Sequence, residues 1–204
     1  MIILDFGSGN SCKNDLSIVK RMINELSRID KDRKCIIKWQ LFKECGENIP
    51  LSHEIFSHAW RDALWRGFET TASVFDIDSL NFLLGFNPKF VKIANRRDLD
   101  WLIGEIPRKI EVIISHASYV PPNHWPKRDK FLCCISKYPA TVEDYESNFE
   151  DFNLRNGISD HTTDWTLYRK YQPEIYEVHY KLEDTTGPDG GAFARTPTKL
   201  EEIL

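Results

Sequence analysis

Short apolar runs alternate along the chain with segments in which apolar residues recur every three or four positions. Nearly continuous runs of Val, Ile, Leu and Phe are typical of parallel strands that helices cover, whereas the second pattern predicts amphipathic helices. Eight runs fit strands: Ile2–Phe6, Cys35–Phe42, Phe68–Phe75, Phe90–Ala94, Glu111–Ser115, Phe131–Ser136, Gly157–Asp160 and Ile175–Tyr180.

Helical patterns lie between most of these runs. In the first of them, five apolar residues fall on one face, and Asn14 or Asp15 can cap its amino end. Between Ser118 and Lys130, three prolines exclude a regular helix, so we expect an irregular fifth crossover there. The predicted helices are Asp15–Leu26, Ser52–Trp65, Asp78–Leu84, Asp98–Ile106, Thr141–Phe149, Thr163–Tyr171 and Thr198–Leu204.

Eight strands with intervening helices favour an α/β fold, a compact (β/α)8 TIM barrel, because sequential βα units produce parallel neighbours. A chain of 204 residues lies at the lower limit for that fold. Periodicity alone leaves an open, doubly wound sheet as the alternative. The length predicts a single domain that covers residues 1–204.

Composition narrows the function classes. The net charge of -4 and the pI of about 5.9 argue against a non-specific nucleic-acid binder, which normally carries a basic excess. The sequence contains no run of about 18 apolar residues and no basic, apolar leader, so we expect neither a membrane span nor a secretory signal. The 5 cysteines form no CxxC pair, which indicates free thiols and a cytoplasmic location.

Two lysines lie inside apolar runs near the carboxyl ends of predicted strands, where the chemistry of a barrel is located. A buried lysine costs desolvation energy unless an anion or a carboxylate compensates it. Lys38 and Lys92 therefore indicate a phosphate or carboxylate site, or else an outward side chain or a buried ion pair with Asp5 or Glu177. Hydroxyl groups at other strand ends can add donors to such an anion: Ser73, Ser136 and Ser159.

Two histidines lie near the ends of the last two predicted strands. Adjacent strands would bring His161 and His179 together, and two imidazoles with open positions suit a divalent transition metal. No HxH or HxxxH pattern supports this interpretation. The alternative is that each histidine is an ordinary hydrogen-bonded residue of the core or surface.

Three motifs in the last third of the chain resemble those of the sialic acid synthases. Gly157–Thr162 matches the GxSDHT signature, Tyr176–Leu182 is similar to the EKHFTL strand, and Gly187–Asp189 is similar to GPDH. Looser matches follow the same order earlier in the chain. They are Asp5–Asn10 with EIGxNH, Ile37–Gln40 with VKFQ, Ala72–Asp76 with STPFD, Val91–Asn95 with KIAS and Cys134–Pro139 with HCxxxYP.

This resemblance implies a (β/α)8 barrel that condenses phosphoenolpyruvate with an N-acetylhexosamine or a related aldose. The products would be a sialic-acid-like 2-keto sugar acid and phosphate. It also implies a divalent metal, typically Mn²⁺, which acts as a Lewis acid on the aldehyde oxygen of the acceptor. The partners would then be phosphoenolpyruvate and an aldose, and a homodimer would form without the domain swap of the family.

The resemblance assigns roles to individual residues. His161 and His179 would be metal ligands, and Asp189, Glu177 and Asp5 would be catalytic. The remaining matched residues would bind substrate: Lys38, Gln40, Ser73, Lys92, Asn95, Ser136, Tyr138 and Ser159.

Several positions depart from the family pattern. Asp5 stands in place of Glu, Asn95 in place of Ser, Ser136 in place of Asn, and Gly190 in place of His. We also expect this chain to lack the family's C-terminal antifreeze-like domain, and with it the domain-swapped dimer. These departures leave two alternatives: a non-catalytic barrel that binds a sugar phosphate or a partner, and a metal-dependent aldolase that uses pyruvate.

Overall fold

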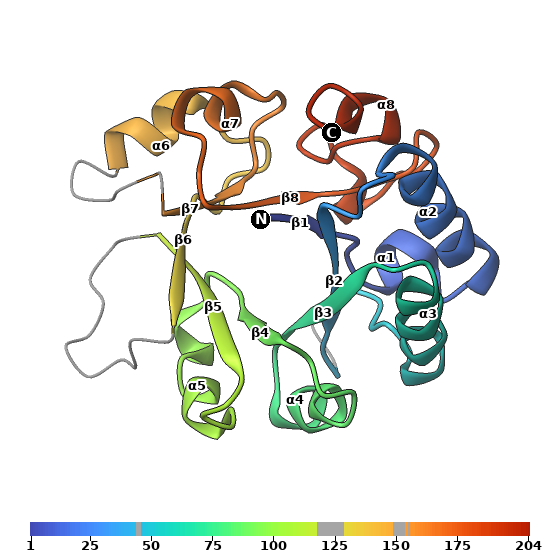
Figure 1. The fold of residues 1–204 in the computed structure, drawn as a ribbon. Helices are drawn as coiled ribbons and strands as arrows, with labels where there is room; N and C mark the ends of the chain where they lie inside the picture. Colours follow the sequence, from blue (N-terminus) through green and yellow to red (C-terminus); the bar gives the residue numbers. More distant parts are fainter. Residues whose placement is uncertain (44–45, 118–128, 149–153, 155) are drawn as a thin grey trace.

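The computed structural model describes residues 1–43, 46–117, 129–148, 154 and 156–204. In this part of the chain, parallel strands form a closed barrel in sequence order, with β1 paired to β8 (Figure 1). The (β/α)8 barrel is confirmed, and the open sheet is excluded. The strands are β1 (Ile2–Asp5), β2 (Cys35–Leu41), β3 (Glu69–Val74), β4 (Phe90–Ile93), β5 (Glu111–His116), β6 (Lys130–Cys134), β7 (Gly157–Asp160) and β8 (Ile175–His179).

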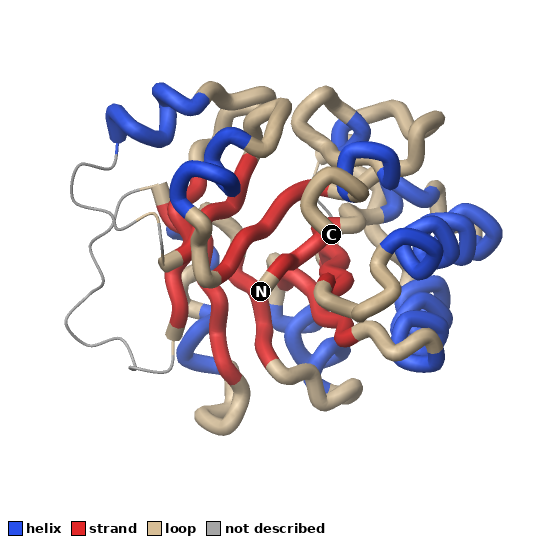
Figure 2. Tube along the Cα trace, turned by 45° about the horizontal axis from the view of Figure 1, so that its top comes forward, coloured by secondary structure: helices blue, strands red, loops and turns tan. Residues whose placement is uncertain are grey.

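Helices surround the strands on the outside of the barrel (Figure 2). Asp15 caps α2 as predicted, since its carboxylate accepts a hydrogen bond from the Ser17 amide. The α-helices are α1 (Gly9–Cys12), α2 (Leu16–Ile29), α3 (His53–Trp65), α4 (Ile77–Leu84), α5 (Leu102–Glu105), α6 (Val142–Asn148), α7 (Thr166–Tyr171) and α8 (Pro197–Leu200). Two 3-10 turns are η1 (Arg97–Leu99) and η2 (Pro188–Gly190).

The helix predicted over Asp98–Ile106 is only partly correct. The segment forms η1 and then the short α5, and Ile106 is extended because the next residue is Pro107. The predicted irregular crossover falls on residues 118–128, which lie outside the described residues. The short helix α1 was not predicted, although Ser8 caps it by accepting a hydrogen bond from the Asn10 amide.

Alternate residues of each strand point into the barrel. Near the amino ends of the strands they form an apolar layer: Ile3, Ile36, Phe90, Ile113, Leu132 and Ile175. Two residues further along the same strands, the inward side chains face the candidate site: Asp5, Lys38, Lys92, Ser115, Cys134 and Glu177. Because inward side chains recur every two residues, the amino end of the barrel interior is filled by apolar side chains. Its carboxyl end carries polar side chains, which form the floor of the site.

Outward side chains of the strands, such as Trp39 and Tyr176, pack in the larger core beneath the helices. The end of the chain lies beside its beginning, since α8 is next to α2 in Figure 1 and Arg28 pairs with Glu201 at 3.2 Å. Four cysteines are buried free thiols, as predicted, and Cys45 lies outside the described residues. Among the described residues, none of the helices has the length and hydrophobicity needed to cross a bilayer.

Candidate active site

A cavity of about 390 Å³ opens at the carboxyl ends of the strands. Every residue that the sequence predicts for the site lines this cavity. They are Asp5, Lys38, Gln40, Ser73, Lys92, Asn95, Ser136, Tyr138, Ser159, His161, Glu177, His179 and Asp189. The structure therefore brings all of the predicted positions together, while their individual roles remain predictions.

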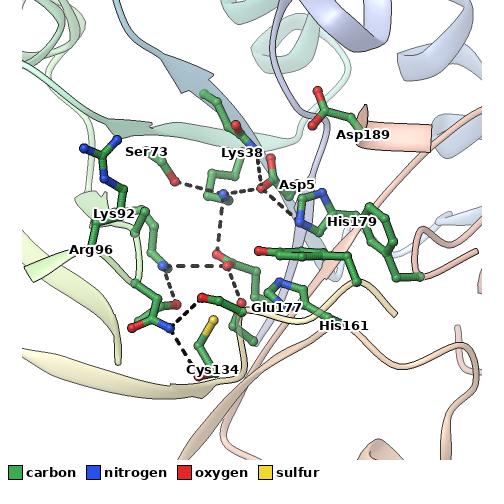
Figure 3. A pocket seen from close by; sticks show the side chains of 18 of the residues that line it. Asp5, Lys38, Ser73, Lys92, Arg96, Cys134, His161, Glu177, His179 and Asp189 are labelled. Atoms are coloured by element: carbon green, nitrogen blue, oxygen red, sulfur yellow. Dashed lines mark hydrogen bonds and ion pairs between the residues drawn. The ribbon is translucent and has the colours of Figure 1, made fainter. Parts of the chain in front are cut away.

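Asp5 and Lys38 form the centre of one side of the cavity (Figure 3). They are directly paired in the β1–β2 register, and the Lys38 ammonium donates to Asp5 Oδ2 at 2.7 Å. Lys38 also donates to the Ser73 hydroxyl at 2.9 Å, and Gln40 donates to Asp5 Oδ2 at 2.9 Å. The buried ion pair between Lys38 and Asp5, one of the alternatives that the sequence left, is therefore present.

Lys92 and Glu177 occupy the neighbouring part of the floor. The Lys92 ammonium lies 3.7 Å from Glu177 Oε1 and donates to the Ser115 hydroxyl at 2.6 Å. The Ser159 hydroxyl donates to the same Glu177 oxygen at 2.9 Å. Glu177 Oε2 is 3.7 Å from the Lys38 ammonium and is buried without a hydrogen-bond partner among the described residues. Glu177 thus bridges both lysines electrostatically and keeps one oxygen available.

These contacts determine the charge states of the floor. Burial would raise the pKa of Asp5 and of Glu177, but the nearby lysines outweigh it, so both pKa values lie below their usual range and both groups are carboxylates. Burial tends to lower the pKa of Lys38, but Asp5 and Glu177 raise it. The pKa of Lys92 is lowered because burial and Lys38 outweigh Glu177.

His161 and His179 lie together in the cavity, with ring centres 5.4 Å apart and with His179 beside Asp5. The Nδ1 atom of His161 is 2.6 Å from the Ile135 carbonyl oxygen, which can only accept, so Nδ1 carries the proton and Nε2 keeps its lone pair. Burial and the proximity of His179 lower the pKa of His161 to about 3, and its imidazole is therefore neutral at neutral pH. Nε2 of His179 is 3.9 Å from Asp5 Oδ2, and its buried Nδ1 has no partner among the described residues.

The chemistry of this pair fits a divalent metal with an open coordination sphere. A neutral imidazole with a free Nε2, fixed by a carbonyl on Nδ1, is the usual form of a histidine ligand. No group of three or more His, Cys, Asp or Glu side chains suited to a metal occurs within the described ranges. Water and substrate oxygens would therefore have to complete the sphere, as they do at catalytic metal sites.

Asp189 reaches the cavity rim from η2 and is held by the amino end of α1. Its Oδ2 atom accepts hydrogen bonds from the Ser8 amide at 3.2 Å, the Ser8 hydroxyl at 3.3 Å and the Ser11 hydroxyl at 3.0 Å. Gly7 permits this approach, because a Cβ atom there would lie 2.5 Å from Asp189 Oδ2 and the residue has a φ of +76°. The turn after β1 and the start of α1, with Gly7, Ser8 and Ser11, therefore position a carboxylate that comes from the far end of the sequence.

Gly157 and the buried Tyr145 fix strand β7, which ends directly before His161. A Cβ at Gly157 would lie 2.4 Å from the Leu132 side chain and 2.9 Å from the Phe131 carbonyl, so only glycine fits between β6 and β7. The Tyr145 hydroxyl donates to the Ser159 carbonyl at 2.6 Å and accepts from the His161 amide at 3.0 Å. The backbone around His161 is thus held on both sides.

Polar and aromatic side chains form the rim. Asn95 donates to the Ser136 hydroxyl at 3.0 Å, which links the ends of β4 and β6. The Tyr138 ring lies 4.1 Å from the His161 ring and 5.0 Å from that of Phe193. The Tyr138 side chain is half exposed and covers the histidine side of the cavity.

Some lining residues were not assigned from the sequence. Ser115 and Cys134 follow from the strand period, because each lies two residues after an apolar inward position. Arg96 follows directly after the β4 motif, but no motif match covered it. Asn48 and Phe193 come from loops, and no pattern in the sequence indicated their place.

Comparison with known proteins gives structural neighbours only: no family model and no curated protein matches the chain. The N-acetylneuraminic acid (sialic acid) synthetase of Leptospira borgpetersenii, solved with citrate, has 22% identity and a TM-score of 0.78, over 98% of this chain and 80% of that one. The spore coat polysaccharide biosynthesis protein SpsE of Bacillus subtilis has 16% identity and a TM-score of 0.73, over 99% and 65%. A truncated 3-deoxy-D-arabino-heptulosonate 7-phosphate synthase of Thermotoga maritima has 10% identity and a TM-score of 0.66, over 99% and 82%.

At these identities the comparisons establish a shared fold. The predicted resemblance to the sialic acid synthases is confirmed at the level of the barrel, which this chain shares with a sialic acid synthetase and a spore coat polysaccharide protein over nearly its whole length.

Proposed function

We propose that this protein condenses phosphoenolpyruvate with an N-acetylhexosamine or a related aldose, giving a sialic-acid-like 2-keto sugar acid and phosphate. The observation that carries this proposal is that one cavity brings together a floor with two lysines and a pair of histidines. Both sets occupy strand ends in the order of the synthase motifs. The neighbours named above, a sialic acid synthetase among them, support the same class.

The donor would lie on the lysine floor. The ammonium groups of Lys38 and Lys92 and the hydroxyls of Ser73 and Ser159 can bind its carboxylate and phosphate. Asn95 and Ser136 add donors at the rim. These groups are fixed before the donor binds, so they can stabilise its charge as it redistributes.

The acceptor would lie between the donor and the histidines. His161 and His179 would hold a divalent metal, which when bound polarises the aldehyde oxygen. C3 of phosphoenolpyruvate forms a bond to the aldehyde carbon, whose oxygen takes up a proton. Water then adds at C2, and one of its protons balances the proton taken up by the aldehyde oxygen. The new C2 hydroxyl loses its remaining proton to the departing phosphate, the bond from C2 to the bridging oxygen breaks, and a 2-keto group and phosphate result. Glu177 Oε2, a buried carboxylate oxygen with no described partner, can accept a hydrogen bond from this water.

The test is release of inorganic phosphate from phosphoenolpyruvate by the purified protein with Mn²⁺ and a panel of N-acetylhexosamines and other aldoses. We expect phosphate and a 2-keto acid in equal amounts with at least one acceptor. Lys38→Met should abolish the reaction, whereas Lys43→Met, on the exposed surface, should not. No phosphate release with any acceptor would overturn the proposal. A product formed from pyruvate, unaffected by Lys38→Met, would favour the aldolase alternative instead.

A further inference from the structure

The positive charges on the floor of the cavity are already balanced by carboxylates. Lys38 is 2.7 Å from Asp5, and Lys92 is 3.7 Å from Glu177. The side chains of these lysines are only 3% and 2% exposed, so their pairs are fixed in place. A phosphorylated three-carbon acid carries a carboxylate and a phosphate group that is largely dianionic at neutral pH. The floor offers such a donor many hydrogen bonds but little surplus positive charge.

Arg96 is placed differently from the two lysines. It follows β4 and Asn95 directly, lines the same cavity, and lies at its edge on the side of Lys92 (Figure 3). Its guanidinium forms an ion pair with Asp98, a residue outside the cavity lining. The side chains of this pair are 46% and 60% exposed. An exposed pair of this kind contributes little to stability, so a competing anion can replace the Asp98 carboxylate at little cost.

We propose that Arg96 is a specificity-determining residue that leaves Asp98 and binds the phosphate group of the donor. This inference rests on the proposed function. The planar guanidinium of Arg96 now donates two hydrogen bonds to the two Asp98 carboxylate oxygens. It can donate to two phosphate oxygens in the same bidentate geometry. It supplies the charge that the paired lysines lack, next to the Asn95 and Ser136 donors.

The test is calorimetric titration of the protein, in the presence of Mn²⁺ and without acceptor, with three ligands: phosphoenolpyruvate, inorganic phosphate and pyruvate. For Arg96→Ala we expect binding of phosphoenolpyruvate and of phosphate to weaken by about 10- to 100-fold, in the range of charge-assisted hydrogen bonds. Pyruvate has no phosphate, so its affinity should not change. Arg97→Ala is the matched control, because Arg97 is the next residue, is also exposed and is not part of the cavity lining.

A second variant leaves Arg96 unchanged and alters Asp98, the carboxylate that competes with the phosphate for it. Asp98→Asn weakens the existing pair, so it should tighten binding of phosphoenolpyruvate by several-fold and leave pyruvate unaffected. Equal affinities for Arg96→Ala and Arg97→Ala, or an equal loss of pyruvate binding, would overturn the role of Arg96 while the synthase proposal stands. If the unmodified protein binds no phosphoenolpyruvate, the proposed function fails and the role of Arg96 fails with it.

Discussion

The Lys38 ammonium lies 2.7 Å from the Asp5 carboxylate, and the two residues are direct neighbours in the register of β1 and β2. Both side chains are almost fully buried. Each charge compensates the other in the buried floor of the cavity. The Lys38 ammonium is also held by the Ser73 hydroxyl, and the two contacts fix its position for a ligand.

Removal of one partner of this pair should destabilise the protein strongly. Asp5→Ala removes the carboxylate that accepts the hydrogen bond of the Lys38 ammonium and leaves only Glu177, 3.7 Å away, to balance this buried charge. Breaking a buried pair in this way costs up to about 3–5 kcal/mol. The double variant Asp5→Ala/Lys38→Met should cost much less than the sum of the single changes, because no unpaired charge remains. Urea unfolding measures both. Asp78→Ala, which breaks the exposed pair with Lys43, is the control and should cost less than about 1 kcal/mol. Equal costs for the two aspartates would contradict this account.

His161 and His179 should be required for metal binding. Each would contribute one imidazole to a site that the protein completes with few other ligands, so His161→Ala or His179→Ala should reduce Mn²⁺ affinity to the level of non-specific binding. Titration followed by electron paramagnetic resonance measures free Mn²⁺ directly. His58→Ala, on the outer helix α3, is the control and should bind as the unmodified protein does. Retention of full Mn²⁺ affinity in both cavity variants would exclude this pair as the site.

Donor affinity should fall at alkaline pH because of Lys92. Burial lowers the pKa of this lysine below its usual value, so its charge is lost earlier than that of an exposed lysine as pH rises. The phosphate group, with a second pKa of about 6, keeps its charge over this range. We expect the Kd for phosphoenolpyruvate to be constant near pH 7 and to increase towards pH 10. In Lys92→Gln, binding should be weak throughout and lack the alkaline decline. The same decline in that variant would mean that another group causes it.

A second buried ion pair, away from the cavity floor, should matter for stability. Arg195 is fully buried, lies 3.2 Å from Asp160 and also donates to the carbonyls of Thr162 and Phe193. The Tyr176 hydroxyl donates to the same carboxylate. Arg195→Met leaves Asp160 charged and buried, and should cost about 3–5 kcal/mol at neutral pH.

The stability lost in Arg195→Met should depend on pH. Burial raises the pKa of Asp160 even though Arg195 opposes it, and loss of Arg195 should raise it further. A carboxyl group whose folded pKa is above its unfolded value stabilises the protein at low pH and loses that contribution as pH rises through the folded value. Unfolding of Arg195→Met should therefore show a smaller loss at pH 5 than at pH 8, and Asp160→Asn/Arg195→Met should recover part of it. A loss independent of pH would contradict an unpaired carboxylate as the cause.

The sequence by itself determined the alternation of inward and outward residues in each strand. That alternation is local, with a period of two, and it correctly placed Lys38, Lys92 and Glu177 at the polar end of the barrel. The motif matches placed His161 and His179 at the same end. Sequence patterns did less well where the backbone depends on its surroundings, as in η1 and the short α1.

Only the tertiary structure decided which of these side chains meet. Closure of the barrel pairs Asp5 with His179 across β1 and β8, and it brings Glu177 within 3.7 Å of both lysines. It also carries Asp189 to Ser8, from the opposite end of the chain. Such contacts depend on register, closure and side-chain rotamers that join residues far apart in sequence. A local period therefore fixes the face on which a residue lies, whereas the partner of that residue is fixed only by the folded barrel.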